Sequence, residues 1–427
     1  MNTITKIRRG LITRLLRRMF VCMSRLPVRE RLVMFESFLG KQYSCNPRAI
    51  YEYMREHHPD FQMVWSVNAD AAGLFAEKGI PHVKRFSIRW FYLLARARYW
   101  VTNSRMPLWI PKPKHTVYVQ TWHGTPLKRL AGDMEEVHMP GTTTEAYKEN
   151  FYKESRNWDY LLSPNAYSTA IFRRAFWFNR QVVEEGYPRN DVLYRADAAH
   201  IRRIKDKYGL PQDKKIILYA PTWRDNQFYQ QGKYKFDLEL DLQLLQRELG
   251  GEYIILLRMH YLVAEHLNLE PFAGFAFDFS QRGDINEMYL AADLLLTDYS
   301  SVFFDYANLK RPIIFYTYDL ENYRDTLRGF YFDFEKQAPG PLVETTPQVL
   351  GAIRYYEEHG LGRFQEKYNV FYNRYCRLED GAATKRAVEQ IFFRKAQDDE
   401  SNDYGASGAD RQSVPDQTAV LIRAENQ

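Results

Sequence analysis

A histidine stands among small and polar residues directly after a short apolar run. Within residues 120–128, His123 precedes Gly124, which permits close backbone approach, and a Thr125-Pro126 pair that can open a helix. Imidazole exchanges a proton near neutral pH, so the segment predicts a general base at His123. A histidine that is merely hydrogen-bonded within a turn is the alternative.

Two other segments offer groups that suit an anion. Arg189 lies in the turn of residues 186–191, and its forked guanidinium matches the geometry of a phosphate. Arg258 and His260 are two positions apart at the end of an apolar run, so in an extended chain they point to the same side. A surface arginine, or a buried pair satisfied by backbone carbonyls, would account for each segment taken alone.

Hydroxyl groups follow two more apolar runs. Thr222 comes after Pro221, and Ser300 and Ser301 precede a predicted helix. Unpaired N–H groups at a helix N-terminus bind phosphate, and Asp305, one turn further on, is placed to take a hydroxyl of a sugar or polyol. A plain loop and an ordinary serine cap are the alternatives.

Familiar catalytic motifs are missing. The sequence contains no G-x-G-x-x-G, no G-x-x-x-x-G-K-[ST], no H-E-x-x-H and no G-x-S-x-G, which disfavours dehydrogenases, P-loop enzymes and the common hydrolases. It has no D-x-D either, so we expect no metal and no cofactor. Cys22, Cys45 and Cys376 are too few and too scattered for a disulfide framework, which favours a reducing, cytoplasmic compartment.

The candidate residues end predicted strands. Apolar runs that alternate with helical segments are predicted as strands at 32–38, 63–67, 99–103, 116–120, 215–220, 253–258, 294–297 and 312–316. Such alternation predicts an α/β protein with two doubly wound parallel sheets, whose strand ends face a central cleft. With 427 residues and 45% hydrophobic content the chain has room for both. We place the two doubly wound domains at 31–195 and 196–395, the latter with closing C-terminal helices, and a disordered polar tail at 396–427.

The first 30 residues differ from the rest. Residues 1–29 hold eight Lys and Arg and no acidic residue, although the whole chain has a net charge of only +6. Ile4, Ile7, Leu11 and Leu15 recur at helical spacing, which predicts a basic amphipathic helix at 1–30. The uncharged stretches are far too short to span a bilayer, so we expect the helix to lie on an anionic membrane surface. A helix that packs on its own domain is the alternative.

The polar segments resemble, in order, the motifs of the CDP-glycerol glycerophosphotransferase family of teichoic-acid enzymes. The resemblance covers roughly residues 32–375 and rests on the strings TWHGTPLK at 121–128, GYPRND at 186–191, YAPTWR at 219–224, RMH at 258–260 and TDYSSV at 297–302. It implies a GT-B fold with the donor in the cleft and peripheral attachment to the cytoplasmic face of the cell membrane. Longer polymerases of the family carry an additional amino-terminal domain, so we expect this chain to be a catalytic core with a basic anchor.

The resemblance also implies a reaction and a set of site residues. Glycerol phosphate would pass from CDP-glycerol to a hydroxyl of a lipid-linked saccharide or polyol-phosphate acceptor, with release of CMP. His123 and His260 would be catalytic. The donor site would comprise His123, Gly124, Thr125, Pro126, Leu127, Arg189, Pro221, Thr222, Arg258, Met259, His260, Ser300, Ser301 and Asp305. The family often has Pro after the second histidine, where this chain has Tyr261.

Two other functions are compatible with the sequence. A CDP-ribitol transferase, or a capsular polyol-phosphate or nucleotide-sugar transferase, would use the same cleft with another donor. A membrane-surface or nucleic-acid-binding protein would use the basic amino terminus instead. No nucleic-acid-binding module is recognisable and the cleft motifs would then have no role, so we expect no nucleic-acid partner.

Overall fold

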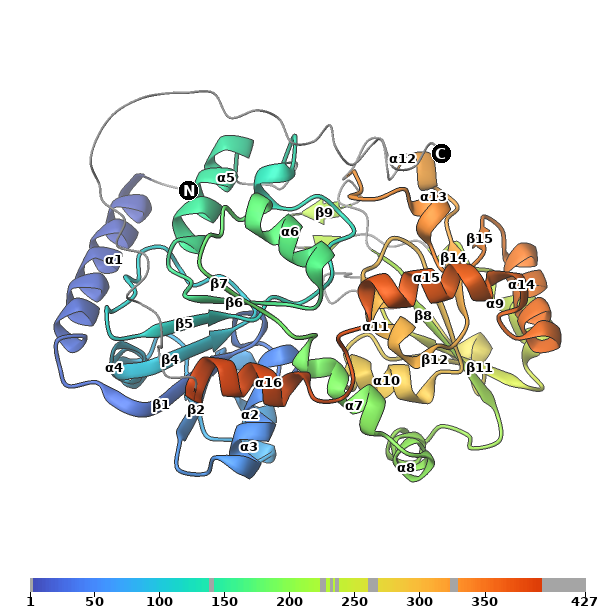
Figure 1. The fold of residues 1–427 in the computed structure, drawn as a ribbon, viewed down its shortest axis with the longest axis horizontal. Helices are drawn as coiled ribbons and strands as arrows, with labels where there is room; N and C mark the ends of the chain where they lie inside the picture. Colours follow the sequence, from blue (N-terminus) through green and yellow to red (C-terminus); the bar gives the residue numbers. More distant parts are fainter. Residues whose placement is uncertain are drawn as a thin grey trace.

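The computed structural model describes residues 3–137, 142–222, 228–230, 233–234, 238–259, 268–322 and 329–393. Two parallel β-sheets, each covered by helices on both faces, lie side by side (Figure 1). We call them the N-terminal sheet and the C-terminal sheet.

The N-terminal sheet has seven strands in the order β3-β2-β1-β4-β5-β6-β7, and every neighbouring pair is parallel. Its strands are β1 (Arg29–Glu36), β2 (Gln62–Val67), β3 (His82–Lys84), β4 (Ala97–Thr102), β5 (Val117–Gln120), β6 (Tyr160–Ser163) and β7 (Gln181–Glu184). Its helices are α1 (Thr3–Met23), α2 (Cys45–His57), α3 (Ala72–Glu77), α4 (Ile88–Arg96), α5 (Thr144–Ser155) and α6 (Ala166–Ala175). Apolar side chains from α1, α4, α5 and α6 pack on one face and those from α2 and α3 on the other.

The C-terminal sheet has six parallel strands in the order β12-β11-β8-β13-β14-β15. Its strands are β8 (Lys215–Ala220), β11 (Tyr253–Leu257), β12 (Ala276–Asp278), β13 (Leu294–Thr297), β14 (Ile313–Tyr316) and β15 (Leu342–Val343). A separate antiparallel pair is formed by β9 (Phe228–Gln230) and β10 (Lys233–Tyr234). The helices are α7 (Asp191–Arg195), α8 (Ala198–Tyr208), α9 (Leu242–Leu249), α10 (Ile285–Ala291), α11 (Val302–Tyr306), α12 (Leu320–Asn322), α13 (Phe334–Gln337), α14 (Thr346–His359), α15 (Gln365–Tyr375) and α16 (Ala383–Val388).

Strand prediction is best where the strand is central. The predicted strands at 215–220 and 294–297 coincide with β8 and β13, both of which are buried along almost their whole length. The predicted strand at 32–38 ends earlier, at Glu36, because Phe38 and Leu39 have positive φ angles and turn the chain away. The short edge strands β3, β12 and β15 were not predicted, since two or three residues give no recognisable period.

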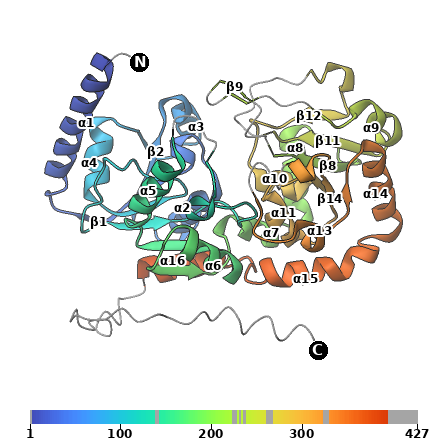
Figure 2. The same cartoon turned by 90° about the horizontal axis from the view of Figure 1, so that it is seen from above.

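The chain passes between the sheets twice. The first passage runs through the 3-10 turn η4 (Pro188–Asn190) and α7, and the second follows α15. After the second passage α16 returns to the N-terminal sheet, where Ala387 and Val388 pack among the residues of α2 (Figure 2). The domain division at residue 195 falls within the first passage and stays a prediction, and the predicted polar tail lies outside the described residues.

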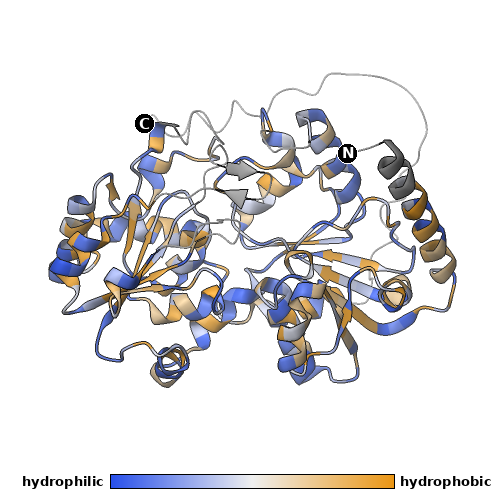
Figure 3. Ribbon diagram, turned by 180° about the vertical axis from the view of Figure 1, so that it is seen from behind, coloured by the Kyte–Doolittle hydropathy of each residue, from blue (hydrophilic) through white to orange (hydrophobic). Residues whose placement is uncertain are grey.

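Helix α1 lies against the outer side of α4 (Figure 1). Phe20 is fully buried and packs at 6.3 Å from the ring of Phe91. Leu11 and Leu15, two residues of the predicted apolar stripe, are 59% and 68% exposed, so these two side chains face away from the protein. Figure 3 shows hydrophobic residues along this part of α1. In the described part of the chain, no helix combines the length and the apolar character that crossing a membrane requires.

Candidate active site

The His123 turn is held by two buried amide side chains. β5 ends at Gln120, and Trp122 adopts φ +50°, which is unusual for a bulky residue. The side-chain oxygen of Gln120 accepts a hydrogen bond from the Trp122 N–H at 3.0 Å. The amide nitrogen of Asn46 donates to the carbonyls of Thr121 and Trp122 at 3.0 and 3.3 Å. These bonds stabilise a strained backbone at the point where β5 ends, as is common at functional sites.

The imidazole of His123 is fixed by one hydrogen bond and two aromatic contacts. Its Nδ1 lies 2.9 Å from the carbonyl oxygen of Asn103. A carbonyl only accepts, so Nδ1 carries the proton and Nε2 carries the lone pair. Among the residues that the structure describes, none forms a hydrogen bond with Nε2. The ring stacks on Trp122 at 4.4 Å and meets the ring of Phe38 edge-on at 5.7 Å. Nε2 is therefore the nitrogen that can act as a base.

The pKa of His123 lies below its ordinary value, at about 4, because surrounding protein atoms desolvate the imidazolium. The hydrogen bond to the Asn103 carbonyl opposes this shift, and the positive charge of Arg189 adds to it. The His123 side chain nevertheless keeps a solvent-exposed surface. With its pKa lowered, His123 is neutral at pH 7 and able to accept a proton.

The turn that carries His123 contacts the C-terminal sheet at Gly124. A Cβ atom at Gly124 would lie 3.1 Å from Oγ of Ser301, which precedes α11. Leu127, a few residues further on, packs in the core of the C-terminal sheet. Its carbonyl accepts a hydrogen bond from the N–H of Tyr331 at 2.8 Å. The predicted site residues of the first and the last motif thus meet in space.

Thr125 and Pro126 continue this connection. Thr125 is buried, and the carbonyl of Pro126 accepts a hydrogen bond from the hydroxyl of Tyr167 at 2.8 Å. The carbonyl of Gly124 likewise accepts from the hydroxyl of Tyr187 at 3.0 Å. Hydrogen bonds from two tyrosines of the N-terminal half therefore stabilise the backbone that follows His123.

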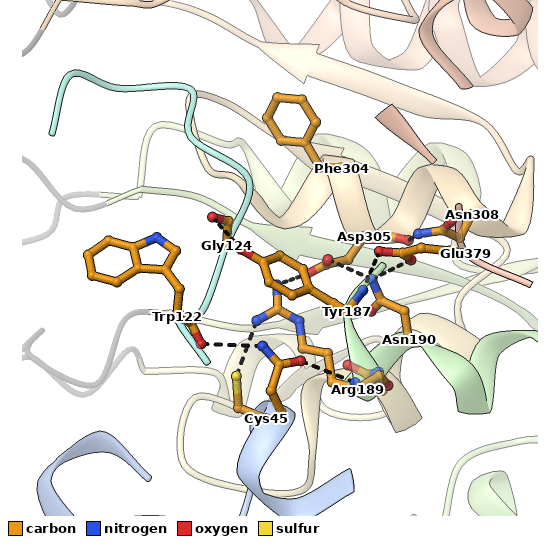
Figure 4. Close-up of polar contacts among 12 residues, drawn as sticks. Cys45, Trp122, Gly124, Tyr187, Arg189, Asn190, Phe304, Asp305, Asn308 and Glu379 are labelled. Carbon is orange, nitrogen blue, oxygen red and sulfur yellow. Dashed lines mark hydrogen bonds and ion pairs between the residues drawn. The ribbon is translucent and has the colours of Figure 1, made fainter. Parts of the chain in front are cut away.

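Arg189 and Asp305, predicted to bind different parts of the substrate, form an ion pair with each other (Figure 4). Nη2 of Arg189 lies 2.7 Å from Oδ2 of Asp305, and both side chains are less than one tenth exposed. The guanidinium also donates to Sγ of Cys45 at 3.2 Å and stacks over Tyr187 at 4.6 Å. In this arrangement Asp305 cancels the charge of Arg189, and the role of either residue as a substrate ligand stays a prediction.

A second carboxylate joins this cluster. The amide nitrogen of Asn190 donates to Asp305 at 2.9 Å and to Glu379 at 2.7 Å, and the N–H of Tyr187 donates to Glu379 at 3.1 Å. Burial raises the pKa of Glu379 to about 8, and the negative charge of Asp305 adds to this. A neutral Glu379 leaves one anion facing one cation, which is the arrangement that a buried site favours. Sequence reasoning missed Glu379, because it stands far from every motif.

Arg258 and Met259 directly follow the strand β11. Nη1 of Arg258 donates to the carbonyls of Phe279 and of Arg282, the latter at 2.7 Å. Burial lowers the pKa of Arg258 from its usual value, and the nearby Asp284 opposes this. With carbonyls as hydrogen-bond partners, the guanidinium keeps its positive charge. The side chain of Met259 is buried in the core, so it is not placed to line an open site. His260 lies outside the described residues.

The ends of β8 and β13 are tied together. The N–H of Thr222, which follows Pro221, donates to a carboxylate oxygen of Asp298 at 2.8 Å. Ser300 and Ser301 follow in the turn before α11, which has only five residues and continues as a 3-10 turn to Leu309. A short helix thus begins where the helix was predicted, and phosphate binding by Ser300 and Ser301 stays a prediction. Within the described residues, no group of three or more His, Cys, Asp or Glu side chains is arranged to hold a metal ion.

Comparisons with known proteins agree with this geometry. The family model described as CDP-Glycerol:Poly(glycerophosphate) glycerophosphotransferase matches residues 18–393. A teichoic acid poly(glycerol phosphate) polymerase of Bacillus subtilis (strain 168) is 60% identical over 91% of this chain, which spans only 52% of that relative. A protein of the same name from Bacillus spizizenii is 55% identical over 90% of this chain and 97% of its own length.

A solved structure is also similar. The wall teichoic acid polymerase TagF has a TM-score of 0.81 at 41% identity, over 92% of this chain and 98% of the solved one. A variant of that polymerase was solved after soaking with CDPG. The similarity confirms the predicted GT-B type fold with two Rossmann-like sheets. The chain belongs to the CDP-glycerol:poly(glycerophosphate) glycerophosphotransferase family.

Proposed function

We propose that this protein transfers glycerol phosphate from CDP-glycerol to a hydroxyl of a lipid-linked teichoic-acid acceptor and releases CMP. The observation that carries the proposal is the position of His123, whose unprotonated Nε2 is supplied by the N-terminal sheet beside the Ser301 turn of the C-terminal sheet. A base next to the junction of the two sheets suits a reaction between two bound substrates. The family and the names of the relatives support glycerol phosphate as the transferred group.

The reaction can be written with its atoms in balance. The acceptor oxygen attacks the β-phosphorus of CDP-glycerol, and its proton passes to Nε2 of His123. The bond between the β-phosphorus and the bridging oxygen breaks, and CMP leaves with that oxygen. Because CMP is stable as an anion, the departing side needs positive charge and N–H donors rather than a strong acid.

Arg258 is the better candidate for that positive charge. Arg189 already faces Asp305, so its charge is compensated, whereas Arg258 donates to carbonyls. The nearby Asp284 is itself paired with Arg48 at 3.0 Å. We therefore assign Arg258 to the pyrophosphate and Arg189 with Asp305 to holding the two sheets together at the site.

The test is release of CMP from CDP-glycerol in the presence of a lipid-linked saccharide acceptor, with CDP-ribitol and UDP-sugars in parallel. We expect turnover with CDP-glycerol that falls by about 10²- to 10⁴-fold in His123→Ala, because a positioned base contributes about that much. Turnover of CDP-ribitol or a UDP-sugar alone would keep the fold and contradict the proposed donor. Normal turnover in a folded His123→Ala variant would contradict the assignment of the base.

The acceptor and the place of action form a second part of the proposal. We infer that α1 lies on the anionic cytoplasmic face of the cell membrane, where a lipid-linked acceptor is anchored. The outward position of Leu11 and Leu15 supports this, because these side chains lie beside the exposed Arg14 and Arg18 and do not pack on the protein. Apolar insertion combined with cationic attraction is the usual basis of such binding.

A further inference from the structure

We propose that Asn103 is a positioning residue that selects which ring nitrogen of His123 faces the substrates. This proposal rests on the proposed function only for its effect on catalysis; its structural content stands alone. Asn103 directly follows β4, next to β5 in the N-terminal sheet, and is completely buried. Its backbone carbonyl holds Nδ1 of His123 at 2.9 Å.

The side chain of Asn103 fixes the position of that carbonyl. Its Oδ1 accepts hydrogen bonds from the N–H of Phe38 at 2.8 Å and from the hydroxyl of Ser104 at 3.2 Å. Its Nδ2 donates to Oγ of Ser37 at 3.1 Å. One buried amide thus joins the ends of β1 and β4, and both of its polar atoms are used.

The turn that Asn103 holds has a backbone conformation that is unfavourable for large residues. Phe38 and Leu39 have φ angles of +45° and +60°, a region that costs free energy for residues with large side chains. The ring of Phe38 in turn meets the imidazole of His123 edge-on. Asn103 therefore controls both the carbonyl that binds Nδ1 and the aromatic ring that flanks the imidazole.

The consequence concerns the tautomer of His123. A proton held on Nδ1 by the carbonyl leaves the lone pair on Nε2, whereas a released ring can protonate either nitrogen and rotate. A histidine with its proton on Nε2 cannot accept another at that atom. Selecting the tautomer is thus a requirement for the base. For metal-bound histidines, the partner that orients the ring typically contributes about 10- to 100-fold, and we expect an effect of similar size here.

The first test is nitrogen NMR of the full chain labelled with ¹⁵N-histidine, at a pH where His123 is neutral. The signals of His123 among the ten histidines are assigned by their loss in His123→Ala. We expect one tautomer with the proton on Nδ1 in the wild type and a mixture in Asn103→Ala. Asn157→Ala, which removes an exposed hydrogen bond from the side-chain amide to the Lys153 carbonyl, is the control and is expected to keep the wild-type signals.

The second test is steady-state kinetics with CDP-glycerol. We expect kcat to fall about 10- to 100-fold in Asn103→Ala, with KM for the donor changed less than about threefold. Asn103→Asp keeps the acceptor for Phe38 and loses the donor to Ser37, so it is expected to lie between the wild type and Asn103→Ala. If Asn103→Ala does not fold, Asn103→Asp and Ser37→Ala replace it in the test. Each of them removes the hydrogen bond that Nδ2 of Asn103 donates to Ser37.

The outcomes separate this inference from the proposed function. An unchanged tautomer and an unchanged kcat in the Asn103 variants would overturn the positioning role even if His123→Ala is inactive. A changed tautomer together with full activity in His123→Ala would uphold the structural role of Asn103 and contradict His123 as the base. A fall in kcat with an unchanged tautomer would overturn the inference as well.

Discussion

Nη2 of Arg189 lies 2.7 Å from Oδ2 of Asp305, and this buried ion pair connects the N-terminal half of the chain to helix α11 of the C-terminal sheet. The two residues are separated by 116 positions in the sequence. Both side chains are less than one tenth exposed, so buried charge contributes to the contact between the two sheets.

Removing the cation should destabilise the fold. We expect Arg189→Met to lower the free energy of unfolding by about 3–5 kcal/mol, because Asp305 would remain buried without its partner. Urea denaturation measures this. The control is Lys153→Met, which breaks the exposed pair with Glu149 and should cost no more than about 1 kcal/mol. Equal small losses in both variants would contradict the role of the buried pair.

Glu379 should make stability fall as the pH rises. Its folded pKa of about 8 is above its ordinary 4.5, so between these values the folded state holds a proton that the unfolded state has lost. The contribution is therefore fully present below about pH 4.5 and is lost as the pH rises through about 8. We expect Glu379→Gln to remove this dependence, so that the variant gains stability relative to the wild type at pH 9. The measurement is the free energy of unfolding of both proteins at pH 6 and pH 9. The same difference between Glu379→Gln and the wild type at both pH values would contradict this prediction.

The lowered pKa of His123 should appear in the pH profile of the reaction. The base acts when neutral, so kcat/KM is expected to hold at pH 6 and to decline only on further acidification, below the ordinary histidine value of 6.5. Arg189→Met removes a charge that lowers this pKa and should move the acid limb to higher pH, provided that the variant is folded. An acid limb at or above pH 7 in the wild type would show that another group is being titrated.

The contact between Gly124 and Ser301 should be sensitive to a single methyl group. A Cβ at Gly124 would lie 3.1 Å from Oγ of Ser301, tighter than ordinary packing, so one of the two turns must move. We expect Gly124→Ala to lower kcat about tenfold, since small misplacements of reacting groups are costly. Adding Ser301→Gly to this variant removes the clashing atom and should restore part of the loss. If the loss of kcat in the double variant equals the combined losses of Gly124→Ala and Ser301→Gly, this contact is not the cause.

Binding to membranes should depend on the outward stripe of α1. We expect Leu11→Glu combined with Leu15→Glu to abolish cosedimentation with vesicles of phosphatidylglycerol and phosphatidylcholine, and the wild type to bind pure phosphatidylcholine weakly. Val370→Glu, at a position 63% exposed on α15, is the control for adding charge to an exposed apolar site. Unchanged binding in the double variant would contradict the proposed orientation.

The central strands and the order of the motifs were readable from local sequence. β8 and β13 were predicted with their observed bounds, because buried central strands are continuous apolar runs. The family prediction is confirmed as well, since its motifs occur in the predicted order in short, ungapped strings. His123 was identified by its place after a strand, which is a local property.

The pairing of distant residues was decided only by the tertiary structure. Arg189 and Asp305 were each predicted to contact substrate, and only the folded chain shows that they pair with each other. Glu379 and Asn103 carry no motif, yet one completes a buried charge cluster and the other orients His123. Local periodicity determines which segments become strands and helices, whereas hydrogen bonds and ion pairs depend on distances between atoms that the sequence separates by up to 236 positions.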